Sequence, residues 1–546
     1  MRIALAQINT TVGAFEQNAA RIKDYTERAK ARGAQLVLFP ELGLVGYPPK
    51  DFLELPEFVH QAERALEDLS RPAAWNRGIS VYLGAIERHE GPGAGLYNAA
   101  ALLVDGQRRI MARKTLLPTY DVFDEGRYFD PGPEVTLAEV AGTKAGLSIC
   151  EDIWNDKAFW RKRRYTRDPI EEMAAKGARL ILNISASPYA QGKPRLREEM
   201  LGAAARHHRV PIAYLNLVGG NDSLVFDGHS TVFDEQGAVI ARAKGFVEDL
   251  VVVDLPGGGG LVAPLAADLD ELTEALIVGT RDYAQKTGFK GAVLGLSGGI
   301  DSCLTAFIAA RAFPPDEVMG VAMPSRYTAQ MSNADAELLA GNLGIRFTTL
   351  PIEPVFEAFL KALRPVFGDA PPDVTEENIQ ARVRGTLLMA LSNKHNKLLL
   401  TTGNKSELSV GYCTLYGDMA GGLAVIGDLP KMTVFSLSKN ANRSREIIPE
   451  RSILRPPSAE LRENQKDEDS LPPYPVLDSL LKAYVEERKE SPELAAMGFP
   501  PDTVKRVLSL VLRSEYKRRQ AAPTLRVSPK AFGEGWRFPI AHRFGY

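Results

Sequence analysis

Three residues with complementary chemistry lie in the first half of the chain. Glu41 and Cys150 each follow a short apolar run that is typical of a buried strand, and Lys114 lies in a third segment of this kind. A thiolate is a strong nucleophile, a carboxylate can accept the thiol proton and return one to a leaving amine, and an ammonium can stabilise an oxyanion. Each residue alone has an ordinary structural interpretation. Together they predict a catalytic group with Cys150 as nucleophile, Glu41 as base and Lys114 as oxyanion partner.

A glycine-rich turn in the second half predicts a phosphate site. Residues 292–296 are apolar and predict a strand, residues 297–302 contain two glycines, and residues 303–309 predict a helix. Glycines allow backbone N–H groups to converge on an anion, and a helix N-terminus adds its dipole. Ser297 and Ser302 can donate further hydrogen bonds, and Asp301 can hold the magnesium that accompanies a nucleotide. The turn lacks the Gly-Lys-Ser/Thr ending of a Walker A loop.

Short apolar runs alternate with amphipathic stretches along both halves, which predicts an α/β fold. In the first half, residues 230–240 predict a hairpin. In the second half, a helix over 269–287 precedes strands over 292–296, 318–323 and 397–401.

The domain prediction follows from two segments of unusual composition. Residues 256–260 are Pro-Gly-Gly-Gly-Gly and end any regular element, which indicates a linker. Residues 452–475 are polar and rich in proline, which predicts a mobile loop. We therefore expect a first domain over 1–255, a linker over 256–266 and a second domain over 267–546.

The composition restricts the partners and the compartment. The 546 residues are 45% hydrophobic and 25% charged, and the net charge is −2, which disfavours nucleic acid and membrane surfaces as partners. The basic run 161–164 is interpreted as a solvated face. The three cysteines are far apart and lack metal-ligand spacing, and the N-terminus has no signal-peptide pattern. The expected location is a reducing compartment, the cytoplasm.

The segments around the first three residues resemble the signature segments of the nitrilase/amidase superfamily. The resemblance rests on residues 39–42, 113–118 and 150–154, in that order. It implies a four-layer αββα sandwich and amide hydrolysis through a thioester on Cys150. In the members that use glutamine, it also implies a substrate-binding set, namely Tyr120, Glu125, Ser187 and Lys193.

The glycine-rich turn resembles the pyrophosphate-binding loop of ATP pyrophosphatases, which cleave ATP to AMP and pyrophosphate. That resemblance implies a doubly wound parallel sheet. It also implies that a carboxylate is activated as an acyl-adenylate and then attacked by ammonia. The implied ATP-binding residues are Gly295, Leu296, Ser297, Gly298, Gly299, Ile300, Asp301, Ser302, Thr402 and Lys431.

The combination of the two halves is similar to the glutamine-dependent NAD synthetases, and the similarity extends over the whole chain. It implies L-glutamine, ATP and deamido-NAD as substrates, Mg²⁺ held by Asp301 and Glu407, and ammonia channelled between the domains. Deamido-NAD contacts are implied at Asn378, Glu407 and Lys517. A homo-oligomer, at least a dimer through the synthetase domain, is also implied.

Two alternatives remain open at the level of sequence. The chain could join a nitrilase-type glutaminase to a different adenylating amide ligase, or it could be a non-catalytic scaffold that retains both folds. Every proposed catalytic position is intact, which argues against the scaffold. A GMP or asparagine synthetase is disfavoured because residue 2 is Arg and no His lies at a convincing triad position.

Overall fold

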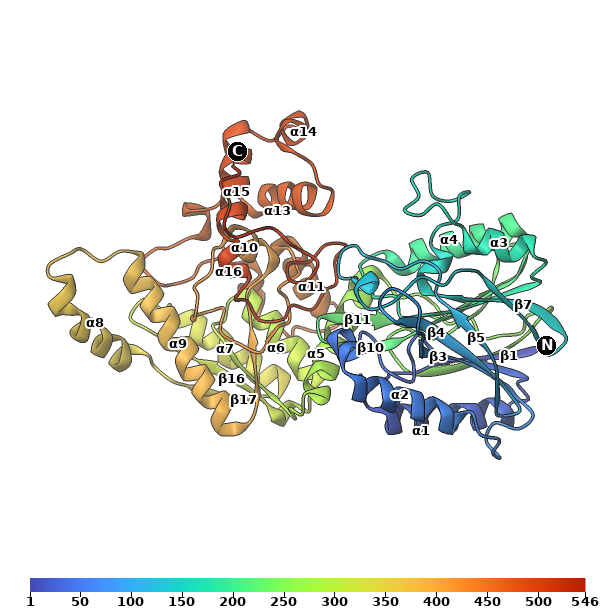
Figure 1. The fold of residues 1–546 in the computed structure, drawn as a ribbon. Helices are drawn as coiled ribbons and strands as arrows, with labels where there is room; N and C mark the ends of the chain where they lie inside the picture. Colours follow the sequence, from blue (N-terminus) through green and yellow to red (C-terminus); the bar gives the residue numbers. More distant parts are fainter. Residues whose placement is uncertain (546) are drawn as a thin grey trace. The chain divides into compact units, whose positions relative to one another are not determined.

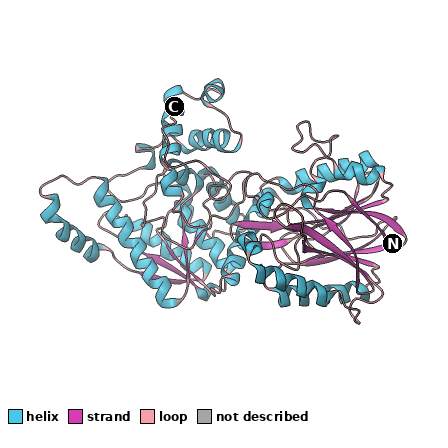
Figure 2. Cartoon of the chain, in the orientation of Figure 1, coloured by secondary structure: helices cyan, strands magenta, loops and turns pink. Residues whose placement is uncertain are grey.

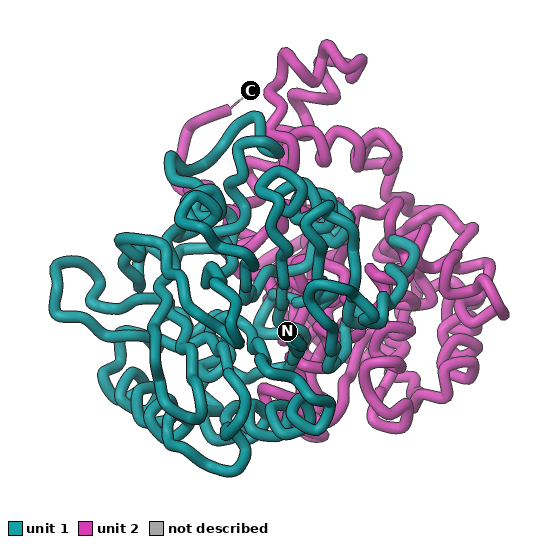
Figure 3. The backbone as a smooth tube through the Cα atoms, turned by 90° about the vertical axis from the view of Figure 1, so that its right-hand side faces the viewer, with its two compact units in different colours: residues 1–268 teal, residues 269–546 magenta. Residues whose placement is uncertain are grey.

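The computed structural model describes residues 1–545 and divides the chain into two compact units, Met1–Asp268 and Leu269–Tyr546 (Figure 3). Both units mix helices with strands, as the alternating pattern predicts (Figure 2). No helix in the described part of the chain is both long and apolar enough to cross a membrane.

Two six-stranded sheets form the centre of the first unit. The first sheet has the order β14 (Asp249–Asp254), β1 (Arg2–Gln7), β2 (Leu36–Leu38), β3 (Ser80–Arg88), β4 (Leu96–Val104), β5 (Gln107–Arg113). The second has the order β13 (Val239–Arg242), β12 (Thr231–Phe233), β9 (Ile212–Asn216), β8 (Leu180–Ser185), β7 (Thr143–Ile149), β6 (Thr136–Val140). A separate hairpin joins β10 (Val218–Asn221) to β11 (Leu224–Asp227). The predicted hairpin over 230–240 is confirmed by the antiparallel pair β12 and β13.

The first unit has four layers, as predicted. One buried cluster includes Leu38 and Leu102 of the first sheet and Leu147 and Leu182 of the second, so the sheets pack face to face. The outer face of the first sheet packs against α1 (Phe15–Ala31) and α2 (Pro56–Leu69), and that of the second against α3 (Pro169–Ala175) and α4 (Lys193–His208). Figure 1 shows the two helix pairs on opposite sides of the sheets. The central strands are buried on both faces, which explains their continuous apolar runs.

The glycine-rich segment after β14 packs on the first unit. Bridges join Asp254 to Gly258 and Arg242 to Val262, and Arg242 Nη1 donates to the carbonyl of Ala263 at 2.6 Å. Residues 258–263 therefore lie beside β14 and the edge strand β13. The next helix along the chain is α5 (Asp268–Lys286), which belongs almost entirely to the second unit.

The second unit contains a five-stranded parallel sheet. Its order is β17 (Arg346–Thr349), β16 (Val318–Ala322), β15 (Ala292–Gly295), β18 (Leu398–Thr401), β19 (Leu423–Ala424). The chain runs outward from β15 to β17 and then returns to β18 on the other side of β15. Right-handed crossovers therefore place the helices on opposite faces, which is the doubly wound arrangement that was predicted. The strand order reverses between β15 and β18, and such switch points hold ligands at the carboxyl ends of their strands.

The helices complete the second unit. Against the sheet lie α6 (Ile300–Ala312), α7 (Gln330–Leu343) and α9 (Val374–His395), and Leu388 of α9 packs on Val293, Val321 and Leu399. The others are α8 (Glu353–Phe367), α10 (Lys405–Val410), α11 (Lys431–Ala441), α12 (Glu450–Leu454), α13 (Tyr474–Leu481), α14 (Ser491–Ala496), α15 (Pro501–Arg513) and α16 (Glu515–Arg518).

The polar segment 452–475 is packed more closely than its composition indicates. Ser452, Gln465, Asp467 and Leu471 are buried, and Asp467 begins the short 3-10 helix Asp467–Asp469. A polar segment can be buried when its groups are hydrogen-bonded, and Tyr474 donates to Asp467 Oδ2 at 2.8 Å. That the segment moves when ligands bind stays a prediction.

Candidate active sites of the two units

Glu41 and Lys114 meet inside the first unit. Glu41 follows β2 closely and Lys114 follows β5 directly, and neither side chain is exposed. Lys114 Nζ lies 2.7 Å from Glu41 Oε1. Glu41 Oε2 accepts a hydrogen bond from the backbone N–H of Ala186 at 2.9 Å, just past the end of β8. The carboxylate is therefore held between residues that follow strands of both sheets.

Glu125 completes the surroundings of Lys114. Its two carboxyl oxygens each lie 2.8 Å from Lys114 Nζ, so this ammonium faces two carboxylates. Burial opposes the charge of Lys114, but Glu125 and Glu41 offset this and raise the pKa of Lys114 well above its ordinary value. Burial raises the pKa of Glu125 to about 7, although the charge of Lys114 acts in the other direction. Glu125 thus lies with the catalytic group.

Two side chains that the sequence analysis did not single out hold these carboxylates. Asn98, in β4, donates from Nδ2 to Glu41 Oε1 at 2.8 Å and to Glu125 Oε2 at 3.3 Å. Tyr47 donates its hydroxyl to Glu125 Oε1 at 3.1 Å. Asn98 is fully buried, and its Oδ1 has no hydrogen-bond partner in the described structure. Neither residue stands in a motif, so only the folded structure reveals their role.

Cys150 occupies a strained turn at the end of β7. It is the first residue of the 3-10 helix Cys150–Ile153 and has φ +45°, a left-handed conformation that non-glycine residues seldom adopt. Burial and then the charge of Glu41 raise the pKa of the Cys150 thiol well above its ordinary value, and Lys114 opposes them. The thiol is therefore protonated at rest, and a base must accept its proton when it attacks.

Asp152 ties the Cys150 turn to the Lys114 segment. Its Oδ1 accepts the backbone N–H groups of Thr115 at 2.9 Å and Leu116 at 2.8 Å. Its Oδ2 accepts the N–H of Ile149 at 3.1 Å. Burial raises the pKa of Asp152 to about 7, and these hydrogen bonds lower it. One carboxylate therefore fixes the spacing of two catalytic segments from different sheets.

The structure gives three of the predicted glutamine contacts partners within the protein. Tyr120 donates to both oxygens of Glu151, the residue after the nucleophile, at 2.9 and 3.0 Å. The N–H of Ser187 donates to Asn216 Oδ1 at 2.8 Å. Lys193 Nζ donates to the carbonyl of Pro188 at 2.8 Å and lies 5.3 Å from the centre of the Trp154 ring. Tyr165, which was not predicted, also donates to Glu151, at 3.1 Å.

A buried ion pair supports the Ser187 segment. Arg197 Nη2 lies 2.5 Å from Asp227 Oδ2, and both side chains are almost completely enclosed. Asn216 Nδ2 donates to Asp227 Oδ1 at 3.4 Å and to the carbonyl of Ser187 at 3.2 Å. Asn216 therefore connects the ion pair to both backbone groups of Ser187.

A cavity of about 310 Å³ lies at the switch point of the second unit. It is lined by Gly295, Leu296, Ser297, Gly299, Ile300, Asp301, Ser302, Thr402, Glu407 and Lys431, all of which were predicted to bind a nucleotide, deamido-NAD or magnesium. Gly298 does not line it but shapes the turn. Its φ is +76°, and a Cβ there would lie 2.2 Å from the carbonyl oxygen of Ser332, so only glycine fits.

A second lysine lies between carboxylates in this cavity. Lys431 Nζ is 2.5 Å from Asp301 Oδ2 and 3.4 Å from Glu407 Oε1. Burial opposes the charge of Lys431, but Asp301 and Glu407 raise its pKa. Burial raises the pKa of Glu407 to about 8 despite the charge of Lys431. Asn404 joins the two acids, since its Nδ2 donates to Asp301 Oδ1 at 3.0 Å and its N–H to Glu407 Oε2 at 3.2 Å.

The polar segment 452–475 contributes one wall of the cavity, through residues 455–461 and Asp467. Arg455 Nη1 donates to Ser332 Oγ at 2.7 Å, and Ser332 Oγ donates to Glu460 Oε1 at 2.7 Å. Gln380 of α9 donates to the carbonyl of Leu461 at 2.9 Å. At these points the segment is therefore attached to α7 and α9 by hydrogen bonds that each involve at least one side chain.

Other charged residues of the cavity were missed. Arg384 of α9 lines it, and burial lowers the pKa of this guanidinium to about 10. Asp418 also lines it, and burial raises the pKa of this carboxyl to about 6. Asp467 was noted only as part of a charged loop. The spacing of these residues gives no signal, because the cavity joins distant segments.

Asn378 and Lys517 do not line the cavity. Asn378 Oδ1 accepts the hydroxyl of Thr414 at 2.8 Å. Lys517 Nζ donates to the carbonyls of Gly411 and Cys413, both at 2.7 Å. They hold the segment 411–414, of which Tyr412 and Cys413 reach the cavity.

The chain matches two families of known proteins. Residues 2–259 match the carbon-nitrogen hydrolase family and residues 272–521 the NAD synthase family. It is 48% identical to a glutamine-dependent NAD(+) synthetase of Synechocystis, over 99% of each chain. It is 43% identical to the Thermotoga maritima protein of the same name, over 100% of this chain and 99% of the other.

Solved structures agree with this relationship. A glutamine-dependent NAD+ synthetase from Acinetobacter baumannii, in complex with ADP, has a TM-score of 0.78 and 40% identity over 99% of this chain and 98% of the other. An enzyme of the same name from Cytophaga hutchinsonii shares the fold, with a TM-score of 0.82 at 24% identity over 99% and 97% of the two chains. The chain belongs to the glutamine-dependent NAD(+) synthetase family.

Proposed function

We propose that this protein converts deamido-NAD to NAD, using ATP and ammonia that it releases from glutamine. The observation that carries the proposal is the presence, in one chain, of a buried Glu41–Lys114–Cys150 group and a glycine-walled cavity with Asp301. The first arrangement suits amide hydrolysis, and the second suits binding of a nucleotide. The enzyme is thus a carbon–nitrogen ligase with glutamine as amide donor.

Glutamine hydrolysis occurs in the first unit. As Cys150 attacks the side-chain amide, Glu41 accepts the thiol proton and passes a proton to the departing ammonia. Lys114 stabilises the oxyanion of the tetrahedral intermediate. Its ammonium already faces Glu41 and Glu125, so it must turn one N–H from a carboxylate toward that oxygen. Water then hydrolyses the thioester, with Glu41 as base. Tyr120, Ser187 and Lys193 bind the amino-acid end of glutamine.

NAD formation occurs in the second unit. The nicotinate carboxylate of deamido-NAD attacks the α-phosphorus of ATP, which forms an acyl-adenylate and releases pyrophosphate. Ammonia then attacks the acyl carbon and AMP leaves. The turn from Ser297 to Ser302 holds the pyrophosphate, with Thr402 and Lys431 as further ATP contacts. Glu407 contacts deamido-NAD directly. Asn378 and Lys517, which also hold the segment 411–414, are the further deamido-NAD contacts.

Mg²⁺ fits the residues that line the cavity. Asp301 and Glu407 offer carboxylate oxygens, and Mg²⁺ prefers one or two carboxylates together with phosphate oxygens. Lys431 Nζ lies between these two acids, so a positive charge already occupies this point of the cavity. Bound there, Mg²⁺ would neutralise the charge that develops on the pyrophosphate.

The remaining parts of the proposal concern organisation. The amidohydrolase domain covers 1–255 and the synthetase domain 267–546, joined by 256–266, and ammonia is channelled between them. The enzyme is at least a dimer through the synthetase domain, since α8 exposes Val355, Phe359 and Val366. A cytoplasmic location suits a reaction that consumes ATP.

The experiment is an NAD synthesis assay with purified protein, ATP, Mg²⁺ and deamido-NAD. Glutamine and ammonium are supplied in separate reactions. We expect NAD, AMP and pyrophosphate in equal amounts from either nitrogen source, and glutamate only with glutamine. A different adenylated acceptor, or no adenylation at all, would contradict the proposal and favour another ligase or a scaffold.

A further inference from the structure

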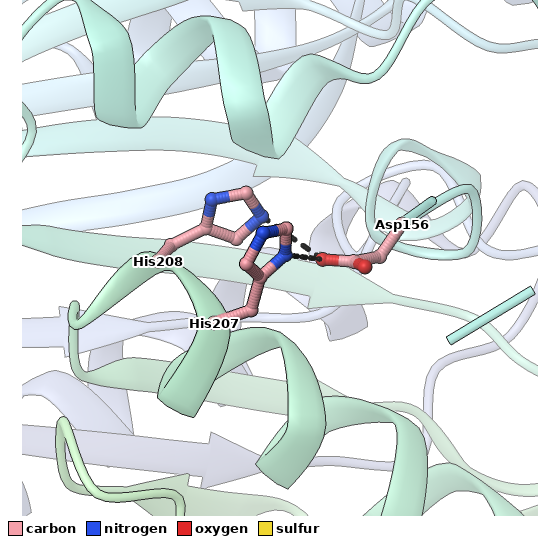
Figure 4. A group of neighbouring side chains, drawn as sticks. All are labelled: Asp156, His207 and His208. Atoms are coloured by element: carbon pink, nitrogen blue, oxygen red, sulfur yellow. Dashed lines mark hydrogen bonds and ion pairs between the residues drawn. The ribbon is translucent and has the colours of Figure 1, made fainter. Parts of the chain in front are cut away.

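Three side chains of the first unit converge outside the catalytic group. Asp156 lies just beyond the 3-10 helix that carries Cys150, and His207 and His208 are the last two residues of α4 (Figure 4). Asp156 Oδ2 is 2.9 Å from His208 Nε2 and 3.5 Å from His207 Nδ1. One ligand atom from each of these three side chains lies within 4.8 Å of the other two, which is close enough for the three to share a metal ion.

We propose that Asp156, His207 and His208 bind a divalent transition-metal ion of the zinc class. Imidazole nitrogen together with carboxylate oxygen is a donor set that Zn²⁺ prefers, at about 2.0–2.2 Å from each atom. Ligand atoms at that distance in a tetrahedron are about 3.3 Å apart. The separations of 2.9 and 3.5 Å from Asp156 Oδ2 to the two nitrogens lie on either side of this value, and all three ligand atoms lie within 4.8 Å of one another.

The surroundings hold the three groups in place for a cation. Asp156 Oδ1 accepts the N–H of Ala158 at 2.7 Å, which leaves Oδ2 directed at the imidazoles. The two rings lie 4.4 Å apart between centroids. Because the histidines end a sixteen-residue helix, the negative end of its dipole also favours a positive ion there.

The nearby acids are already engaged elsewhere. Asp168 accepts the backbone N–H groups of Glu171 at 3.2 Å and Lys157 at 3.3 Å, and Glu171 pairs with Lys157 Nζ. They add negative charge without competing for the position between the histidines.

Access to the site is open on one side. Asp156 is 1% exposed and His208 7%, whereas His207 is 37% exposed. A metal can therefore enter past His207 and retain water as a fourth ligand. Each neutral imidazole then carries its proton on its other nitrogen, His207 on Nε2 and His208 on Nδ1, so the lone pairs of His207 Nδ1 and His208 Nε2 face the metal.

The location suggests what the metal does. Asn155, next to Asp156, donates from Nδ2 to the carbonyls of Tyr165 at 2.9 Å and Arg167 at 2.5 Å. Tyr165 in turn donates to Glu151 beside the nucleophile. A metal joining Asp156 to the end of α4 therefore fixes the base of the segment 156–168, which also carries Arg164 over the Tyr120 ring at 3.8 Å.

The test is Zn²⁺ binding by the full chain after treatment with a chelator, measured in competition with a chromophoric chelator. The variant is His207→Ala, chosen because His207 is exposed. The matched control is His395→Ala, which removes an exposed histidine at the end of α9. We expect one Zn²⁺ site in the wild type and in His395→Ala, with affinity at least about tenfold lower in His207→Ala. Equal affinity in all three proteins would overturn the proposal.

Two further measurements keep the result independent of Cys150 and of folding. Co²⁺ bound at this site should show d–d absorption without a sulfur-to-metal charge-transfer band, and such a band at the first equivalent would overturn the proposal. Zn²⁺ should raise the thermal midpoint of the wild type and of His395→Ala. Asp156→Asn should lose this response if it folds. A full Zn²⁺ response in His207→Ala would also count against the site.

Discussion

A lysine faces two acids in each unit, but the two lysines lie in different surroundings. Both lysines are buried, but Lys114 is enclosed between two packed sheets, whereas Lys431 lines a cavity at the ends of parallel strands. One acid beside each lysine holds its proton to an unusually high pH, because burial raises the pKa of Glu125 to about 7 and that of Glu407 to about 8. The same local chemistry is therefore used twice.

The difference between the two lysines follows from what each site must hold. The first site places a nucleophile and a base around one small amide, so a closed pocket with fixed hydrogen bonds suits it. The second must admit a nucleotide with several charges, so its lysine and acids face a cavity and a glycine turn. In the proposed function, the lysine of the first site stabilises the transition state, and the lysine of the second site occupies a position that suits a cation.

The largest effect should come from removing the acid of the open site. Asp301→Asn keeps the size of the side chain but removes the charge that faces Lys431 and Mg²⁺. We expect NAD formation from either nitrogen source to fall about 1,000-fold or more, while basal glutamine hydrolysis continues. Asp316→Asn, an exposed acid on the same domain, is the matched control. Normal ammonium-dependent synthesis by Asp301→Asn would show that the acid beside Lys431 is not required for NAD formation.

The acid of the closed site should set a pH limit. Glu125 is ionised only above about pH 7, so we expect kcat/KM for glutamine hydrolysis to fall about tenfold per pH unit below that value. Glu125→Gln should lower the rate about 100-fold and abolish this limb. The measurement is glutamate release between pH 5 and 9, in the presence of the synthetase substrates. If kcat/KM of Glu125→Gln still falls below about pH 7, another titrating group causes the fall.

The same pKa of Glu125 has a consequence for stability. The folded protein retains the Glu125 proton between pH 4.5 and about 7, where an unfolded chain releases it. The wild type should therefore lose stability relative to Glu125→Gln as pH rises through this window. Thermal unfolding of both proteins across this range measures the difference. A constant difference would show that the raised pKa is wrong.

Asn98 should have a smaller, positioning effect. It donates to both Glu41 and Glu125, and a hydrogen bond to a charged group corresponds to a change in rate of about 10-fold to about 100-fold. We expect Asn98→Ala to lower kcat for glutamine hydrolysis by this factor. The pH below which kcat/KM falls should also shift, and ammonium-dependent synthesis should be unchanged. Asn76→Ala, which removes another buried asparagine that bonds only to backbone, should leave the limb in place.

The smallest effect is coupling between the two reactions. Free ammonia is mostly protonated at neutral pH and then cannot attack, so release before the adenylate forms is unproductive. We expect ATP and deamido-NAD together to raise glutamine turnover about fivefold or more, with the segment 452–475 as the responding element. Glutamate release with and without these substrates measures it. Equal rates would leave two independent enzymes on one chain.

The sequence predicted the parts of these sites that lie next to strand ends. Glu41 and Cys150 follow apolar runs, and the glycine turn lies between a strand and a helix, so their local patterns predict where they meet. Asn98 could not be found in this way, because it lies within β4 and only its contacts with Glu41 and Glu125 give it a role.

The resemblance to a family also left details that only the structure supplies. Asn378 and Lys517 are predicted to contact deamido-NAD, which stays a prediction, and in the structure they bind the segment 411–414. The composition of 452–475 predicts a mobile loop, which stays a prediction. In the structure Asp467 of this segment is buried, and Tyr474 donates to one of its oxygens. The contacts of Asn378 and Lys517 join segments that are distant in the sequence, and local patterns do not contain such contacts.

The central claim is that ammonia is made at one site and used at the other, and Cys150→Ala tests it most directly. NAD formation by this variant is measured with glutamine and with a high concentration of ammonium, beside the wild type. We predict that glutamine-driven synthesis falls about 1,000-fold or more while ammonium-driven synthesis stays at the wild-type rate. Loss of both activities in a folded Cys150→Ala protein, or retention of both, would contradict the account.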